Sequence, residues 1–113
     1  MSSVHDIIPW AGHVNYAASK GGVHLLMETM AQEMAPERIR INAIAPGAIQ
    51  TPMLDAALID QGLTVDDITP MMSLIGRIGQ PREVAQGTLW MASDLASYVH
   101  GTTLHVGGGF ELI

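Results

Sequence analysis

The chain has 113 residues, of which 48% are hydrophobic and 14% are charged. This composition excludes intrinsic disorder, because enough apolar surface is available to form a core. Five basic and eleven acidic residues give a formal net charge of −6, which disfavours nucleic acid and anionic membranes as partners. The absence of cysteine excludes disulfides and thiolate metal sites and fits a cytoplasmic location. No apolar run reaches the roughly 18 residues of a membrane span.

Signals for helices and strands alternate along the first part of the chain. Residues 1–4 are predicted to end a strand, and residues 6–13 to form a loop that leads into a helix. This helix is predicted from about residue 15 to residue 34. Its buried face is expected to consist of side chains at helical spacing, namely Tyr16, Lys20, Val23, Met27, Met30 and Met34. Further apolar residues on other sides suggest that the helix packs on two neighbours, namely Leu25, Leu26 and Ala31.

A strand is predicted to follow this helix. Pro36 stops the helix, because proline lacks the N–H donor and clashes with the preceding turn. Residues 38–45 then read as a buried strand that ends at Pro46 and Gly47. A strand that returns after a helix is the βαβ unit of a doubly wound parallel sheet. Since ligands bind at the carboxyl ends of such strands, residues 46–51 are expected at the mouth of a pocket. The alternative is that Pro46 and Gly47 only make a turn.

The second half of the chain begins with a long excursion. Residues 52–75 show broken helical periodicity, which is expected of a mobile lid over a substrate. Their scattered aspartates are typical of a solvated face and not of a paired-carboxylate hydrolase. A helix is predicted from about residue 81 to residue 93, with proline at its first position and an acid in its first turn. The final strand is predicted at about residues 102–106.

Tyr16 and Lys20 form the most informative pair in the sequence. They lie four residues apart, so both occupy one helical face. An ammonium beside a phenol favours the phenolate, and such a phenol can protonate a carbonyl oxygen or deprotonate an alcohol. Ser3, thirteen residues upstream of Tyr16, would hold that oxygen in place. The three residues predict a serine-tyrosine-lysine proton-transfer site, although the same pair also arises by chance on amphipathic surface helices.

Several short segments resemble the short-chain dehydrogenase/reductase family and occur in the order expected there. These segments are residues 2–5, 16–22, 40–52, 76–81 and 101–108. The resemblance covers essentially the whole chain, and within the family it is closest to bacterial glucose 1-dehydrogenases. It implies an α/β fold that is the C-terminal half of a Rossmann-type doubly wound parallel sheet, with residues 1–113 forming one partial domain. It also implies an NAD(P)-dependent oxidoreductase that interconverts a hydroxyl and a carbonyl, on glucose or another sugar.

The resemblance assigns roles to individual residues. Tyr16 is implied as the general acid/base, Lys20 assists it and holds the nicotinamide ribose, and Ser3 orients the substrate oxygen. Ile49 would offer backbone groups, and Thr51 its hydroxyl, to the nicotinamide carboxamide. The complete set implied to bind NAD or NADP is Tyr16, Lys20, Pro46, Gly47, Ile49 and Thr51.

Among the five histidines, only His5 is given a role. His5, two residues after Ser3, would contact a polyol substrate, and the alternative is that it stabilises its loop. No metal site is expected, because none of the histidines shows metal-ligand spacing.

Parts of the family pattern are expected to be missing. No glycine-rich βαβ segment is present, because neither glycine cluster, at residues 21–22 or 107–109, follows a strand and opens a helix. Gly107 replaces the usual aspartate and is expected to loosen the strand end. The isolated chain is therefore expected to be inactive and to form a homo-oligomer through the Tyr16–Lys20 helix. The alternative function is a non-catalytic remnant that acts through oligomerisation.

Overall fold

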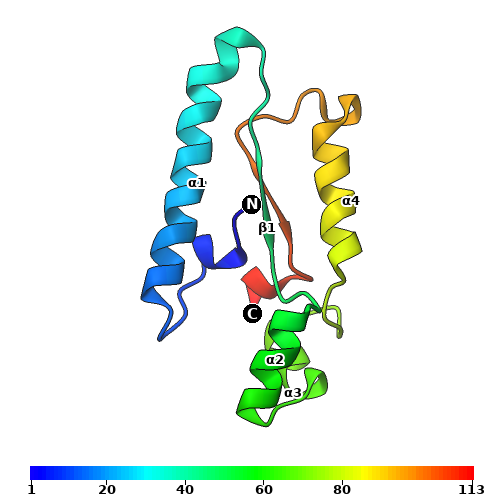
Figure 1. The fold of residues 1–113 in the computed structure, drawn as a ribbon. Coiled ribbons are helices and arrows are strands. Elements are labelled where there is room, and N and C mark those ends of the chain that lie inside the picture. The colour runs from blue at the N-terminus through cyan, green and yellow to red at the C-terminus, as the bar shows by residue number, and fades with distance from the viewer.

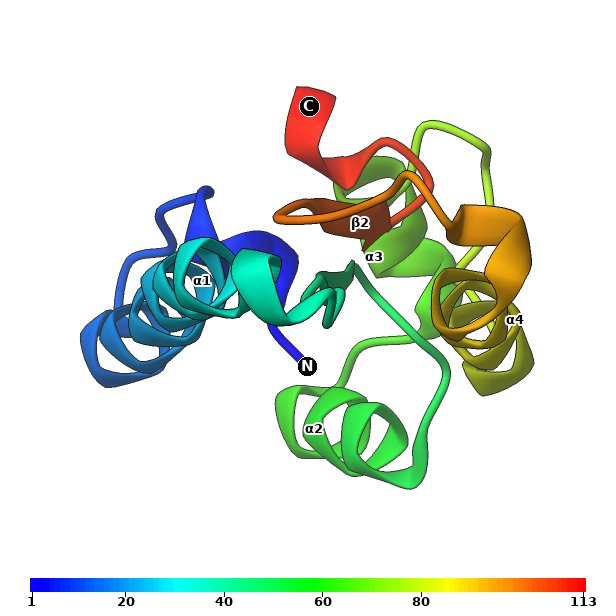
Figure 2. The ribbon, with the colours of Figure 1, turned by 90° about the horizontal axis from the view of Figure 1, so that it is seen from above.

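A computed structural model describes residues 1–113, and its centre is a two-stranded parallel sheet. Strand β1 (Ala43–Pro46) pairs with strand β2 (Thr103–Val106). Helix α1 (Val14–Met34) and helix α4 (Pro81–Ala92) lie on opposite sides of this sheet (Figure 1, Figure 2). The expected fold class, an α/β arrangement with parallel strands that matches the C-terminal half of a Rossmann-type fold, is confirmed.

Two further helices and four short turns complete the chain. Helix α2 (Pro52–Gln61) and helix α3 (Val65–Met72) lie beyond the carboxyl ends of the strands (Figure 1). The 3₁₀ turns are η1 (Val4–Asp6), η2 (Ala35–Glu37), η3 (Asp94–Ala96) and η4 (Phe110–Leu112). Helix α4 packs directly on both strands, whereas α1 packs mainly on the η1 turn, which in turn contacts β1. The η1 turn therefore lies between much of α1 and the sheet, although His24 of α1 reaches Thr103 of β2 directly. No helix combines the length and apolar character needed to cross a membrane.

The helix predicted from residue 15 to residue 34 is confirmed as α1, but its buried face differs from the prediction. Met27 and Ala31 are buried, whereas Met30 is 39% exposed and Tyr16 is 40% exposed. The prediction of a continuous buried stripe through all six positions is therefore wrong. The reason is that the small η1 turn covers less of the helix than a full sheet face would.

The structure corrects both strands predicted in the first half of the chain, since the first does not form and the second is shorter than predicted. Residues 1–4 form no strand; the Ser2 N–H donates to the Ile44 carbonyl over 2.8 Å, and the chain then enters the η1 turn. Strand β1 starts only at Ala43, opposite Thr103, so residues 38–42 have no neighbouring strand. In that segment the Arg40 side chain instead donates to carbonyl groups at the end of α4 and in the connection that follows it, namely those of Met91, Ser93 and Val99.

The segment 52–75, for which the sequence shows broken helical periodicity, holds two short helices, α2 and α3, separated by a turn. Thr51 caps α2 by accepting the Leu54 N–H, and Gly62, with a φ of 66°, ends it. Thr64 begins α3 through a capping box. Apolar residues from both helices are buried against the segment before α4, forming a small core of Leu58, Ile68 and Ile78. The mobility expected of a lid stays a prediction.

The helix predicted at about residues 81–93 and the strand at about 102–106 are confirmed as α4 and β2. Arg77 and Gln80 hold the carboxylate of Glu83 in the first turn of α4. The Arg77 guanidinium donates over 2.6 Å and 2.8 Å, and the Gln80 N–H donates over 2.8 Å. The hydrogen bond from Arg77, followed by that from Gln80, lowers the pKa of Glu83 from 4.5 to about 2.

This pKa predicts a small acid-dependent loss of stability. A carboxylate with a lowered folded-state pKa stabilises the fold above its unfolded pKa, and this stabilisation disappears as the pH falls from 4.5 towards about 2. Glu83→Gln is expected to lower the thermal midpoint at neutral pH and to match the wild type near pH 2. The effect is small because both side chains are exposed. Glu33→Gln is the control for loss of one charge, and a Glu83→Gln difference that persists unchanged near pH 2 contradicts the prediction.

Candidate active site

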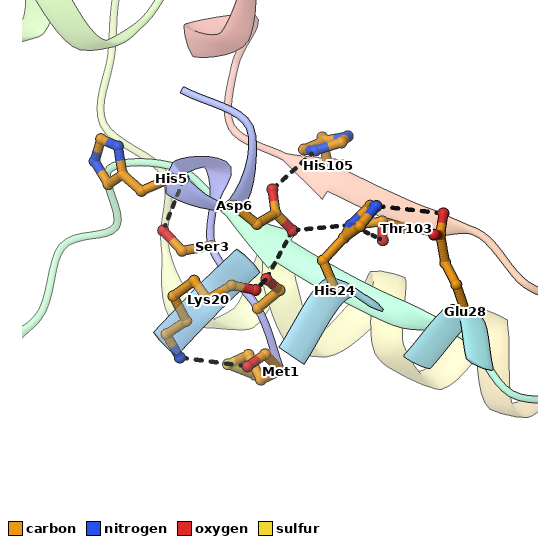
Figure 3. Close-up of polar contacts among 10 residues, drawn as sticks. Met1, Ser3, His5, Asp6, Lys20, His24, Glu28, Thr103 and His105 are labelled. Carbon is orange, nitrogen blue, oxygen red and sulfur yellow. Dashed lines mark hydrogen bonds and ion pairs between the residues drawn. The ribbon is translucent and has the colours of Figure 1, made fainter. Parts of the chain in front are cut away.

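Tyr16 and Lys20 lie side by side near the start of α1, as their spacing predicts. The Lys20 ammonium is 5.6 Å from the centre of the Tyr16 ring. Lys20 Nζ also donates to the Met1 carbonyl over 3.4 Å (Figure 3). Tyr16 as a whole residue is 40% exposed.

Ser3 and His5 lie on the η1 turn. Ser3 is buried, and its Oγ caps the turn by accepting the His5 N–H over 3.3 Å (Figure 3). The Ser3 hydroxyl keeps its own hydrogen as a donor. The His5 ring lies 6.1 Å from the Tyr16 ring in an edge-on arrangement, and its Nδ1 lies 3.2 Å from the Ile8 carbonyl. His5 therefore has both the loop contact and the position near Tyr16 that its two predicted roles require.

The segment from Pro46 to Thr51 follows the carboxyl end of β1. Ile49 pairs with Gly79 in an isolated bridge, which uses the Ala48 carbonyl and the Gln50 N–H. The N–H and carbonyl of Ile49 itself take no part in these two bonds. The Thr51 hydroxyl accepts the Leu54 N–H over 3.3 Å and keeps its hydrogen as a donor. These groups fit the carboxamide of a nicotinamide, which has both donors and an acceptor.

The glycine clusters do not fit a pyrophosphate. Residues 21–22 lie inside α1. Residues 107–109 follow strand β2, but they open only the three-residue η4 turn and not a helix. So short a turn lacks the row of free N–H groups that a longer helix presents to phosphate oxygens. Neither glycine cluster therefore provides a pyrophosphate site.

The prediction that Gly107 loosens the end of β2 is wrong. The Gly47 N–H donates to the Val106 carbonyl over 3.1 Å. A Cβ atom on Gly47 would lie 2.6 Å from the Gly107 Cα, so the two backbones touch. The absence of side chains is what allows the two strand ends to approach this closely.

A polar cluster around Asp6 was missed in the sequence. The Asp6 carboxylate is fully buried, and its Oδ2 accepts the Ser2 hydroxyl over 2.7 Å. His24 of α1 and His105 of β2 face the same carboxylate (Figure 3). No local spacing could have shown this, because the residues come from three distant positions. No group of three histidine or acidic side chains in the chain has a geometry that could hold a metal ion.

The parallel strands and the arrangement of α1 and α4 define a Rossmann-type α/β protein. The family model described as "Enoyl-(Acyl carrier protein) reductase" matches residues 1–111. The chain belongs to the short-chain dehydrogenase/reductase family, of which it represents the C-terminal portion.

Relatives of known name or structure agree with this family. The 3beta-hydroxysteroid dehydrogenase 1 of Eggerthella lenta is 48% identical over 112 residues, which cover 99% of this chain and 42% of that protein. The aldohexose dehydrogenase of Thermoplasma acidophilum gives a TM-score of 0.89 at 32% identity, covering 99% of this chain and 46% of that one. The structure of ElxO with NADP bound gives a TM-score of 0.89 at 27% identity, with coverages of 99% and 45%.

The chain spans less than half the length of these three proteins. The relatives are also varied, and they do not point to glucose dehydrogenases in particular.

Proposed function

We propose that this chain supplies the proton-transfer part of an NAD(P)-dependent oxidoreductase that interconverts a hydroxyl and a carbonyl. The observation that carries the proposal is the Lys20 ammonium, 5.6 Å from the ring centre of an accessible tyrosine. Tyr16 gives a proton to the carbonyl oxygen, or takes one from the alcohol. Lys20 assists this proton transfer from its position beside the ring, and the Ser3 hydroxyl donates a hydrogen bond to the reacting oxygen.

The proposed cofactor is NAD or NADP, which supplies or accepts the hydride when bound. Pro46, Gly47, Ile49 and Thr51 would hold its nicotinamide, and Lys20 together with Tyr16 would contact its ribose. The free backbone groups of Ile49 support this assignment, as does the NADP bound to ElxO.

The proposed substrate is a secondary alcohol or the corresponding ketone. A sugar is supported by the similarity to an aldohexose dehydrogenase, and a ring alcohol by the similarity to a hydroxysteroid dehydrogenase. His5 would contact the substrate beside Tyr16, and residues 52–75 would cover it. A cytoplasmic location is part of the proposal and is supported by the absence of cysteine.

Cofactor binding tests this proposal directly. In a Trp90→Phe background, Trp10 is the only tryptophan, and it lies 4.6 Å from the His5 ring. NADH is expected to quench its emission with saturation. Lys20→Met is expected to weaken binding about tenfold or more, because a hydrogen bond from a charged group is lost. Arg38→Met, on a turn at the other end of α1, is the matched control. The proposal is contradicted if the quenching of Trp10 by NADH does not saturate, or if Lys20→Met leaves the affinity for NADH unchanged.

A second candidate function is docking without catalysis. Helix α1 exposes large apolar side chains, with Leu25 63% exposed and Leu26 58% exposed. Exposed apolar surface of this kind favours contact with another protein chain, and a homo-oligomer through α1 is the proposed form. Sedimentation of the same samples over a concentration series separates the two candidates. Self-association without any response to NADH favours docking.

A further inference from the structure

We propose that Asp6 is a positioning residue whose buried carboxylate ties the η1 turn to helix α1 and to strand β2 at the same time. This turn carries His5 and is capped by Ser3, so its position sets where both side chains lie relative to Tyr16. The inference rests on the proposed function only in treating Ser3 as the group to be positioned. The tie itself is a property of the folded chain.

Three contacts from three parts of the chain converge on this carboxylate (Figure 3). Oδ2 accepts the Ser2 hydroxyl over 2.7 Å and lies 3.4 Å from His24 Nδ1 on α1. Oδ1 lies 3.9 Å from His105 Nε2 on β2. The Ser2 hydroxyl is also 3.3 Å from the Lys20 carbonyl, so the same cluster reaches the turn of α1 that carries the lysine of the site.

Among titratable side chains, only these two histidines approach the Asp6 carboxylate. Its side chain is fully buried, and a buried carboxylate is costly unless it is paired and hydrogen-bonded. Lys20 does not pair with it, because the ammonium is directed to the Met1 carbonyl. No arginine pairs with it either. His24 is itself held in place by Glu28 at 3.3 Å and by Thr103 at 3.4 Å. The orientation of the carboxylate is therefore fixed by groups outside its own turn.

Asp6 contacts His24 of α1 and His105 of β2, and the contact with His105 is the weaker of these two. Asp6 Oδ1 and His105 Nε2 are both buried, and neither has a hydrogen-bond partner. Their separation of 3.9 Å exceeds a hydrogen bond by about 1 Å. Buried polar atoms without partners are uncommon in folded proteins, and here two of them face each other. The η1 turn is thus held more closely to α1 than to β2. A movement of the turn towards β2 would bring Asp6 Oδ1 and His105 Nε2 within hydrogen-bond distance.

The test uses the full chain with Trp90→Phe, so that Trp10 reports on the η1 turn through its contact with His5. Asp6→Ala is expected to raise the acrylamide quenching constant of Trp10 about twofold, as expected of a locally loosened segment, while the helical circular dichroism is retained. Asp6→Asn is expected to restore the wild-type constant. Its oxygen can still accept the Ser2 hydroxyl, and its amide can donate to His105.

Two further variants keep the result decisive. Glu33→Gln, which removes one exposed acid near the other end of α1 and leaves the Asp6 cluster intact, is the control for the loss of one negative charge and is expected to change nothing. His105→Leu removes only the contact between Asp6 and β2. It is expected to raise the quenching constant of Trp10 less than Asp6→Ala does. If Asp6→Ala does not fold, His105→Leu still tests whether Asp6 holds the turn.

The proposal is overturned if quenching is unchanged in both Asp6→Ala and His105→Leu. It is also overturned if Asp6→Asn fails to restore the wild-type constant, or if Glu33→Gln raises it as much as Asp6→Ala. None of these readings involves NADH, so a failure of cofactor binding remains separate from a failure of this inference.

Discussion

Replacing Tyr16 with phenylalanine is expected to lower the rate of carbonyl reduction about 10²–10⁴-fold, the usual contribution of a positioned general acid. Phenylalanine keeps the ring and its neighbours, the Lys20 ammonium at 5.6 Å and the His5 ring at 6.1 Å. Only the hydroxyl is removed. Because Tyr16 is 40% exposed, the fold is expected to tolerate the change, and a loss of rate at saturating cofactor then reports on the hydroxyl and not on the fold.

This rate is best measured in a chimera, because the 113 residues alone are expected to show no steady turnover. The chimera places the N-terminal part of the Eggerthella lenta relative, which is 48% identical to this chain where the two align, ahead of Met1. A panel of ketones with NADH and NADPH serves as substrate. Tyr98→Phe, at a fully exposed tyrosine, is the matched control and is expected to keep full activity. Equal rates for the Tyr16→Phe and wild-type chimeras would remove Tyr16 from the mechanism.

Gly47→Ala is expected to destabilise the fold by about 1–3 kcal/mol, the usual range for an overpacked site. The new Cβ atom would lie 2.6 Å from the Cα of Gly107 and 3.1 Å from its carbonyl oxygen. Both are backbone atoms, which cannot rotate away as a side chain would. The added methyl group must therefore push the ends of β1 and β2 apart and strain the bond from the Gly47 N–H to the Val106 carbonyl.

Gly22→Ala is the matched control for this substitution. Gly22 lies inside α1, and a Cβ atom added to it would meet nothing within 4 Å beyond its own helix. Alanine is therefore expected to stabilise the helix by about 0.5–1 kcal/mol. Urea unfolding of both variants gives the two free-energy changes. Opposite signs are the expected result, and an unchanged stability of Gly47→Ala would be incompatible with the close approach of the two strand ends.

Local signals explain what could be predicted from the sequence. Pro81 and the acid at Glu83 start α4 within one turn of each other, and the spacing of Tyr16 and Lys20 is a property of any helix. Helices α2 and α3 are short, so their periodicity is a weak signal. Stronger signals were present in Thr51 and Thr64, which cap the two helices.

Contacts between distant residues explain what could not be predicted. The strand predicted over residues 38–45 is too long, because its start depends on Thr103, some sixty residues later in the chain. Asp6 looked like a loop residue, because His24 and His105 approach it only in the folded chain. Burial of the Tyr16 face was overestimated for the same reason, since the η1 turn that covers α1 is small.

The placement of α1 beyond the η1 turn has a consequence for the surface area of the chain. The accessible surface of the whole chain is 7363 Å² for a mass of 12.0 kDa, whereas a compact protein of that mass exposes about 6,000 Å². The excess is larger than the roughly 800 Å² that one partner contributes to a standard interface. Unfolding therefore uncovers less new surface than chain length suggests, and both the heat-capacity change and the sensitivity to denaturant are correspondingly reduced.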